Sequence, residues 1–79
     1  MKRFVVAMEV SAEAWGDDQV RRMAIEDLEA QELRGPRGGR YVRTTALGPL
    51  EIGYNLLRPV VEVRAYCMGK YVRPRHARP

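Results

Sequence analysis

The stretch VVEVRAYC, residues 60–67, is the clearest β-strand in the 79-residue chain. It is rich in β-branched residues and contains neither Gly nor Pro, the residues that most often interrupt strands. Val61 and Val63 alternate with Glu62 and Arg64, so one side of the strand is apolar and the other is charged. A strand of this kind needs other strands beside it and an apolar layer across its apolar side.

Two further strand candidates lie near the ends of the chain. In residues 3–10 every even position is apolar, and the odd positions include Val5 and Ala7. Because both sides are partly apolar, we place this strand near the middle of a sheet. After the strand at 60–67, we expect a turn over residues 68–70 and a short strand over residues 71–73.

The segment between residues 40 and 54 has the pattern of a β-hairpin. Residues 40–47 and 50–54 both alternate, and Gly48-Pro49 between them is a tight-turn dipeptide. Leu50, Ile52 and Tyr54 fall on one face of the second strand.

The sequence predicts one helix, which begins after Gly16 and runs to a stop at Leu33-Arg34-Gly35-Pro36. Ser11 could instead cap a helix that begins at Ala12. The adjacent acidic residues Asp17 and Asp18 favour a helix start at this point, because carboxylates cap and stabilise the positive end of a helix. Arg34-Gly35-Pro36 provides the stop. The side chains expected to face the sheet are those of Val20, Met23, Ala24 and Leu28.

These elements predict a small single α+β domain with the order β-α-β-β-β. We expect an antiparallel or mixed sheet of four to five short strands, with one helix packed on one face and the other face open to water or a partner. The domain should cover residues 1–73, and residues 74–79 should form a flexible Arg/Pro tail.

The inventory of reactive side chains is small. The chain has one Cys, one His and one Ser, so neither a zinc site with four Cys or His ligands nor a disulfide can form within it. Glu51 and Glu62 lie on neighbouring strand candidates, but Arg64 stands where a nuclease would carry Lys, and Arg cannot act as a general base. Cys67 is expected to be a small buried hydrophobic residue. We therefore predict a protein that is not an enzyme and that uses no cofactor and no metal.

The sequence also predicts a cytoplasmic protein with no membrane contact. No stretch approaches the roughly 20 apolar residues that a membrane helix needs. The apolar run at residues 4–8 is too short for the core of a secretory signal. Because small secreted chains usually carry several disulfides, their absence indicates a reducing compartment.

Charge is segregated along the chain. Residues 1–33 contain four basic and eight acidic side chains, whereas residues 34–79 contain ten basic and two acidic ones. Twelve of the fourteen basic residues are Arg, which pairs with carboxylates and phosphates in a forked geometry. A GC-rich genome would raise the Arg count but would not explain its segregation. We therefore expect an acidic helix face and a basic face or tail, suited to an acidic partner surface or to a nucleic-acid backbone.

The pattern Gly, basic, Tyr, Val, Arg occurs twice, at residues 39–43 and 69–73. On a strand, the Tyr and Arg of each copy point to one face and the Val to the other. If the valines face the helix, two Tyr–Arg pairs face outward, and these residue types are enriched in interface hot spots. The alternative is that each Tyr ring covers a sheet edge. The predicted partner-binding residues are Arg37, Arg40, Tyr41, Arg43, Lys70, Tyr71 and Arg73.

The first hypothesis for function is a non-catalytic binding protein that occludes the surface of a partner, most simply an acidic protein or complex. In size, single-domain build, charge segregation and lack of catalytic residues, the chain resembles the small inhibitors that phages make against bacterial defence complexes, anti-CRISPR proteins among them. That resemblance of general character implies a phage or mobile-element inhibitor of a nucleic-acid-handling defence complex.

Two alternatives belong to other classes. The chain could be a homo-oligomeric structural subunit that pairs through an open sheet edge or bare sheet face, so both a monomer and a homodimer stay open. It could also be a small basic protein that binds DNA or RNA directly. The arginines that would grip phosphates in that case are Arg34, Arg37, Arg40, Arg43, Arg73 and Arg75.

Overall fold

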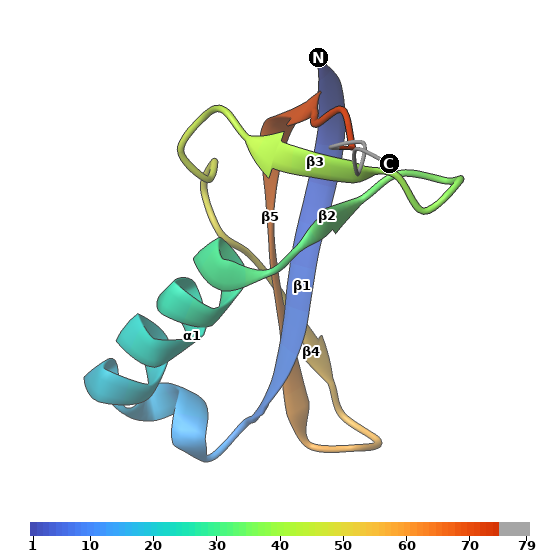
Figure 1. Cartoon of the computed structure of the whole chain (residues 1–79). Helices are drawn as coiled ribbons and strands as arrows, with labels where there is room; N and C mark the ends of the chain where they lie inside the picture. The colour runs from blue at the N-terminus through green and yellow to red at the C-terminus, as the bar shows by residue number, and fades with distance from the viewer. Residues whose placement is uncertain (75–79) are drawn as a thin grey trace.

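Strand β5, Val60–Tyr71, is the centre of the fold in the computed structural model, which describes residues 1–74. Strand β1, Lys2–Ser11, pairs with one edge of β5 along its whole length. Strands β3, Arg40–Arg43, and β4, Glu51–Asn55, both pair with the other edge. The short strand β2, Leu33–Arg34, adds to β3, and every pairing is antiparallel. Figure 1 shows the resulting curled sheet with the helix lying across one side of it.

The α+β architecture is confirmed, and the predicted order β-α-β-β-β corresponds to β1, α1, β3, β4 and β5. The sheet has five strands, including the two-residue β2, which the sequence pattern did not indicate. The predicted tail begins at Pro74, and its residues 75–79 lie outside the described part of the chain.

The predicted hairpin at residues 40–54 is wrong. β3 and β4 do not pair with each other but follow one another along the same edge of β5, as the partners Tyr41↔Tyr71 and Glu51↔Arg64 show. The connecting residues stay on that edge, because the backbone N–H of Gly48 donates to the carbonyl of Tyr66 at 2.8 Å. Gly48-Pro49 therefore lies in a bulged link within one interrupted strand. A long neighbouring strand offers more hydrogen bonds to a chain that continues than to one that turns back.

The predicted turn at residues 68–70 and separate strand at 71–73 are also wrong, because β5 continues through Gly69 to Tyr71. A Cβ atom at Gly69 would lie 2.9 Å from the Phe4 ring and 3.0 Å from Leu33. The absence of a side chain is therefore what allows Phe4 and Leu33 to pack directly on the strand.

The helix α1, Asp18–Ala30, begins at the predicted point, with the Asp17 carboxylate accepting from the backbone N–H of Gln19 at 2.8 Å. It ends three residues before the predicted stop, because Leu33 belongs to β2 and is buried. A short 3-10 turn, η1, Ala14–Gly16, precedes the helix.

The core lies between α1 and the β1–β5 pair. Ala24 and Leu28 are the buried side chains of the helix, whereas Met23, which was also expected to face the sheet, is exposed. The cluster of buried residues consists of Val6, Leu28, Leu33, Val61, Val63, Ala65 and Cys67. Within residues 1–74 the opposite face of the sheet, with Val5 and Ala7 on β1, is left open. The prediction that this strand lies near the middle of the sheet is wrong, because β1 pairs with β5 on one side and forms an edge on the other.

Truncation of Leu28 to Ala should lower the free energy of unfolding by about 2–4 kcal/mol, because a fully buried Leu leaves a cavity when it is shortened. Met23→Ala on the same helix should change it by less than about 1 kcal/mol. Urea denaturation of the two variants checks this difference, and equal losses would show that the helix is not packed as described.

The Gly69→Ala variant should lose about 1–3 kcal/mol of stability, because its new methyl group overlaps the Phe4 ring. Gly53→Ala in β4 is the matched control, since nothing lies within 4 Å of a Cβ atom built there. A thermal midpoint unchanged by Gly69→Ala would contradict the close packing of Phe4 on β5.

Candidate functional site

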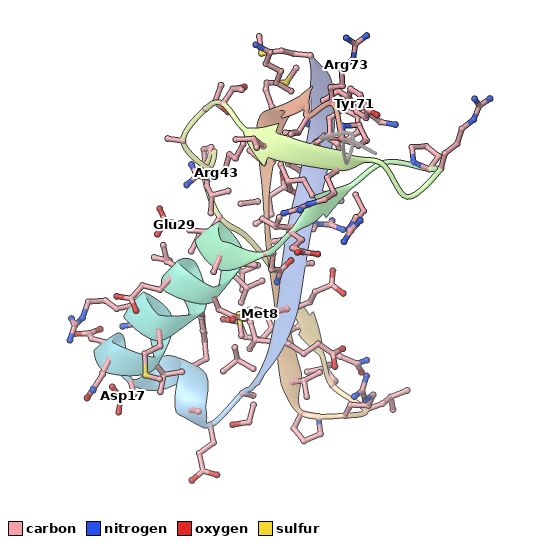
Figure 2. The ribbon with its side chains drawn as sticks, viewed as in Figure 1. Met8, Asp17, Glu29, Arg43, Tyr71 and Arg73 are labelled. Atoms are coloured by element: carbon pink, nitrogen blue, oxygen red, sulfur yellow. The ribbon has the colours of Figure 1, made fainter. Side chains whose placement is uncertain are left out.

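The strand register gathers basic residues at one end of an elongated molecule, whose principal extents are 53 × 23 × 23 Å. Lys2 at the start of β1 lies opposite Gly69 near the end of β5, and Arg43 of β3 lies opposite the same glycine. Figure 2 shows Arg73 and Tyr71 at this end and Asp17 at the other. We call it the basic end, and its members are Lys2, Arg3, Arg34, Arg37, Arg40, Arg43, Lys70 and Arg73.

These basic side chains have few carboxylate partners. Within residues 1–74, Arg34 is the one member of the basic end that forms an ion pair, with Glu32 at 3.2 Å. Glu29 shares a groove with Arg43, but the two do not come within the 4.0 Å of an ion pair. By contrast, three arginines outside the basic end are paired with acidic residues. They are Arg21, Arg58 and Arg64, with Asp18, Glu9, Glu51 and Glu62 as their partners.

The two tyrosines of the repeated pattern do not face outward with valines beneath them. Tyr41 lies opposite Tyr71, and the Tyr41 ring packs on the Phe4 ring with a centroid distance of 4.9 Å. Val42 points to the opposite face and is 55% exposed. The interpretation that the valines face the helix is therefore wrong. The tyrosine rings lie on the helix side of the sheet because Gly69 has no side chain and leaves room for aromatic rings there.

Tyr71 is less buried than Tyr41, and half of its surface is exposed. Its ring meets the Tyr41 ring edge-on at 5.6 Å. The sequence alternative, in which each Tyr ring covers a sheet edge, does not describe them either, because β3 and β5 both lie inside the strand order. The Tyr41 ring packs against the core, and the Tyr71 ring packs on Tyr41.

The glycines of the β2–β3 loop also serve the tyrosines. A Cβ atom at Gly35 would lie 2.8 Å from the Tyr41 ring, and one at Gly39 would lie 3.1 Å from the Tyr71 ring. Gly38 adopts a positive φ of 77°, which the tight loop requires. The segment RGPRGGR, residues 34–40, is therefore a hairpin laid against two aromatic rings, with its arginines left at the surface.

A groove of about 700 Å³ lies at the surface of the basic end. Three arginines, Arg34, Arg40 and Arg73, border it together with Tyr71. The Arg34 guanidinium is held in place by Glu32 and by the carbonyl of Gly38 at 3.1 Å. The groove thus offers guanidinium donors and an aromatic face to an anionic group.

The structure brings the predicted partner-binding residues to one end but not to one face. Arg40 and Lys70 are on the face of Val42, while Tyr41, Arg43 and Tyr71 are on the helix side. Lys2 and Arg3 were missed, because only the pairing of β1 with β5 carries the start of the chain to this end.

The other candidate reactive groups have structural partners. Arg64 lies between Glu51 and Glu62, at 3.4 and 3.6 Å. The Ser11 hydroxyl accepts from the backbone N–H of Ala14 at 3.1 Å, and Cys67 is buried as predicted. Within residues 1–74, no group of three or more His, Cys, Asp or Glu side chains is placed to hold a metal ion.

Replacement of Tyr41 by Ala should lower the free energy of unfolding by about 1–3 kcal/mol, because the half-buried ring fills space beside Phe4. Tyr41→Phe should keep most of the stability, since the ring rather than the hydroxyl makes the contact. Denaturant titration distinguishes the two outcomes, and a fully stable Tyr41→Ala protein would show that the ring is not part of the core.

In the described residues, no helix combines the length and the apolar character needed to cross a bilayer. Comparison with protein-family models, curated proteins and solved structures gives no match to this chain. The chemistry of its own side chains, and of the basic end above all, is therefore the basis for a functional assignment.

Proposed function

We propose that this chain is a non-catalytic binding protein whose basic end docks on an acidic surface of a partner protein and occludes it. The observation that carries the proposal is the gathering of seven basic side chains that form no ion pair within residues 1–74. Like charges held close together repel one another, so the basic end costs stability in the free protein. A partner that supplies carboxylates removes this repulsion and gains charge-assisted hydrogen bonds.

The basic end also has the side-chain mixture of a protein interface. Tyr71 is half exposed there, and Val42 and Val72 are exposed beside it. Arg and Tyr are the residue types most enriched in interface hot spots, and exposed aliphatic side chains add apolar area. The exposed valines gain nothing from a phosphate backbone, so this mixture favours a protein partner.

The ion pairs of Glu51 and Glu62 with Arg64 support the proposal of binding without catalysis. Glu51 and Glu62 are the two carboxylates on the open face of β4 and β5, and Arg64 pairs with both. Both carboxylates are thus occupied by an Arg, which cannot itself act as a general base.

We extend the proposal to a class of protein, an inhibitor made by a phage or mobile element against a nucleic-acid-handling defence complex, similar in kind to anti-CRISPR proteins. The support for it is the small single domain and the separation of charge between its two ends. A small domain with separated charges can inhibit a larger complex by covering one of its binding surfaces, and this needs no catalysis.

Charge reversal tests the docking surface. The triple variant Arg37→Glu, Arg40→Glu, Arg73→Glu should lower the affinity for the partner roughly a hundredfold, because three charge pairs of about 1 kcal/mol each are lost and repulsion is added. Arg22→Glu on α1 is the control for a single charge reversal outside the basic end and should keep the affinity. The measurement is affinity capture from lysate of the source cells, followed by titration with the captured protein.

Nuclease treatment of the lysate separates the proposed partner from a nucleic acid. Capture that survives nuclease and is lost only in the triple variant supports the proposal. Capture that disappears with nuclease would instead identify a direct DNA or RNA binder. In that case affinity for a duplex should fall with a log–log salt slope of roughly −5 for six neutralised phosphates. Equal capture by the wild-type and triple-variant proteins would refute docking through the basic end.

A further inference from the structure

Among residues 1–74, no strand pairs with the outer edge of β4, which lies at the end of the sheet opposite the basic residues. Strand β4 pairs with β5 through Glu51, Gly53 and Asn55, whose partners on β5 are the even-numbered residues. The same even positions of β5 accept hydrogen bonds farther along that edge, at Tyr66 and Met68. By the alternation of an antiparallel ladder, the backbone N–H and C=O groups of Ile52 and Tyr54 therefore point away from β5.

Within residues 1–74, no hydrogen bond from another segment reaches the backbone groups of Ile52 and Tyr54. The side chains of the strand are exposed as well, with Tyr54 at 69%. The loop that follows adds Leu56 and Leu57, which are 92% and 94% exposed. With open hydrogen-bonding groups and uncharged side chains at Ile52 and Tyr54, this edge is a template for a further strand.

The edge of the sheet formed by β1, in contrast to the β4 edge, is protected against the addition of another strand. On β1, the side-chain amide of Gln31 donates to the carbonyl of Ala7 at 2.8 Å, which fills the middle of that edge. Charged Arg3 and Glu9 flank it on the outer face. These are the devices by which proteins prevent strand addition, and β4 has neither at its two open positions.

We propose that the occupant of the β4 edge is a second copy of this chain, joined antiparallel about a two-fold axis at Gly53. In this register Ile52 lies opposite Tyr54 of the other copy, and Tyr54 opposite its Ile52. These are the positions whose backbone groups are open, so the pair exchanges four hydrogen bonds. Cross-strand pairing of a β-branched with an aromatic side chain is among the favourable combinations.

The charges of the strand agree with self-pairing. Glu51 lies opposite the neutral Asn55 of the other copy, so no like charges meet across the axis. Gly53 lies opposite itself, where the absence of side chains removes any clash on the outer face. In an antiparallel pair, residues that lie opposite each other place their side chains on the same face of the sheet. The two helices of the dimer therefore lie on the same face of one continuous sheet.

The geometry sends the two basic ends of the dimer in opposite directions. β4 runs antiparallel to its copy, so the two β5 strands are antiparallel as well. Each lies with its Tyr71 end away from the axis. The dimer is thus bivalent for the proposed partner, while the contact itself uses none of the basic residues. Dimerisation and docking are therefore tested separately.

Light scattering coupled to size-exclusion chromatography measures the molar mass of the protein and so tests dimerisation through the β4 edge. The wild-type chain should shift with rising concentration from 9.1 kDa to twice that mass. The double variant Ile52→Lys, Tyr54→Lys should remain a monomer at all concentrations, because Lys is placed opposite Lys and its charge opposes pairing. Val5→Lys, on the exposed side of β1, is the matched control and should dimerise like the wild type. A monomeric wild type, or a dimer abolished by Val5→Lys and not by the double variant, overturns the proposal.

Cysteine cross-linking tests the register. Gly53→Cys should form a disulfide-linked dimer under mild oxidation, because its non-hydrogen-bonded pair lies about 4.5 Å apart at Cα and a Cβ atom fits there. Glu51→Cys is the control on the same strand and face. Its two copies would be displaced by four residues, about 13 Å, which is too far for a disulfide. Cross-linking of Glu51→Cys without Gly53→Cys would overturn the register. The native Cys67 is buried and does not interfere.

Discussion

The ladder of hydrogen bonds along both edges of β5 is the interaction on which the rest of the structure depends. β1 occupies one edge from Ser11 to Lys2, and β3, the bulged link and β4 share the other. The buried residues Val61, Val63, Ala65 and Cys67 all belong to this strand. β5 therefore fixes the placement of β1, β3 and β4, and its buried side chains form the layer on which Leu28 of the helix packs. A chain with a thin core gains from such an arrangement, because one fully satisfied strand organises most of the backbone.

The fold class followed from local patterns, but two of the connections did not. The alternation at residues 60–67 and the Asp17 cap are local signals, and both predictions agree with the structure. Gly48-Pro49 and Gly69 were interpreted as turns, because glycine permits turning. In the folded chain the first lies in a bulge, and the second accommodates the Phe4 ring. Whether a glycine bends the chain or admits a neighbour depends on a residue distant in the sequence, which local propensity cannot reveal.

In the candidate site, too, some features could be predicted from the sequence and others depend on residues distant in the chain. Charge segregation along the sequence becomes segregation in space, because antiparallel pairing of β1 with β5 brings the basic N-terminal residues to the arginines of β3 and the loop before it. The face of the tyrosines was not predictable, since a shift of one position exchanges the two sides of a strand. Tyr41 lies on the helix side because Phe4, Leu33 and the bare Gly69 form a recess for aromatic packing there. The docking surface is therefore an end of the molecule rather than a flat sheet face.

The pairing of β1 with β5 has a mechanical consequence. Lys2 is opposite Gly69, so the two strands enter and leave the sheet side by side, as Figure 1 shows for the start of β1 and the end of β5. A force that pulls these two strand ends apart acts along the hydrogen bonds and not across them. The ten residue pairs of the ladder then separate one after another, and each carries the load in turn. Tension applied there would peel the sheet from the Phe4 end toward Ser11 at low force, even though the same ladder resists sliding of the two strands past each other.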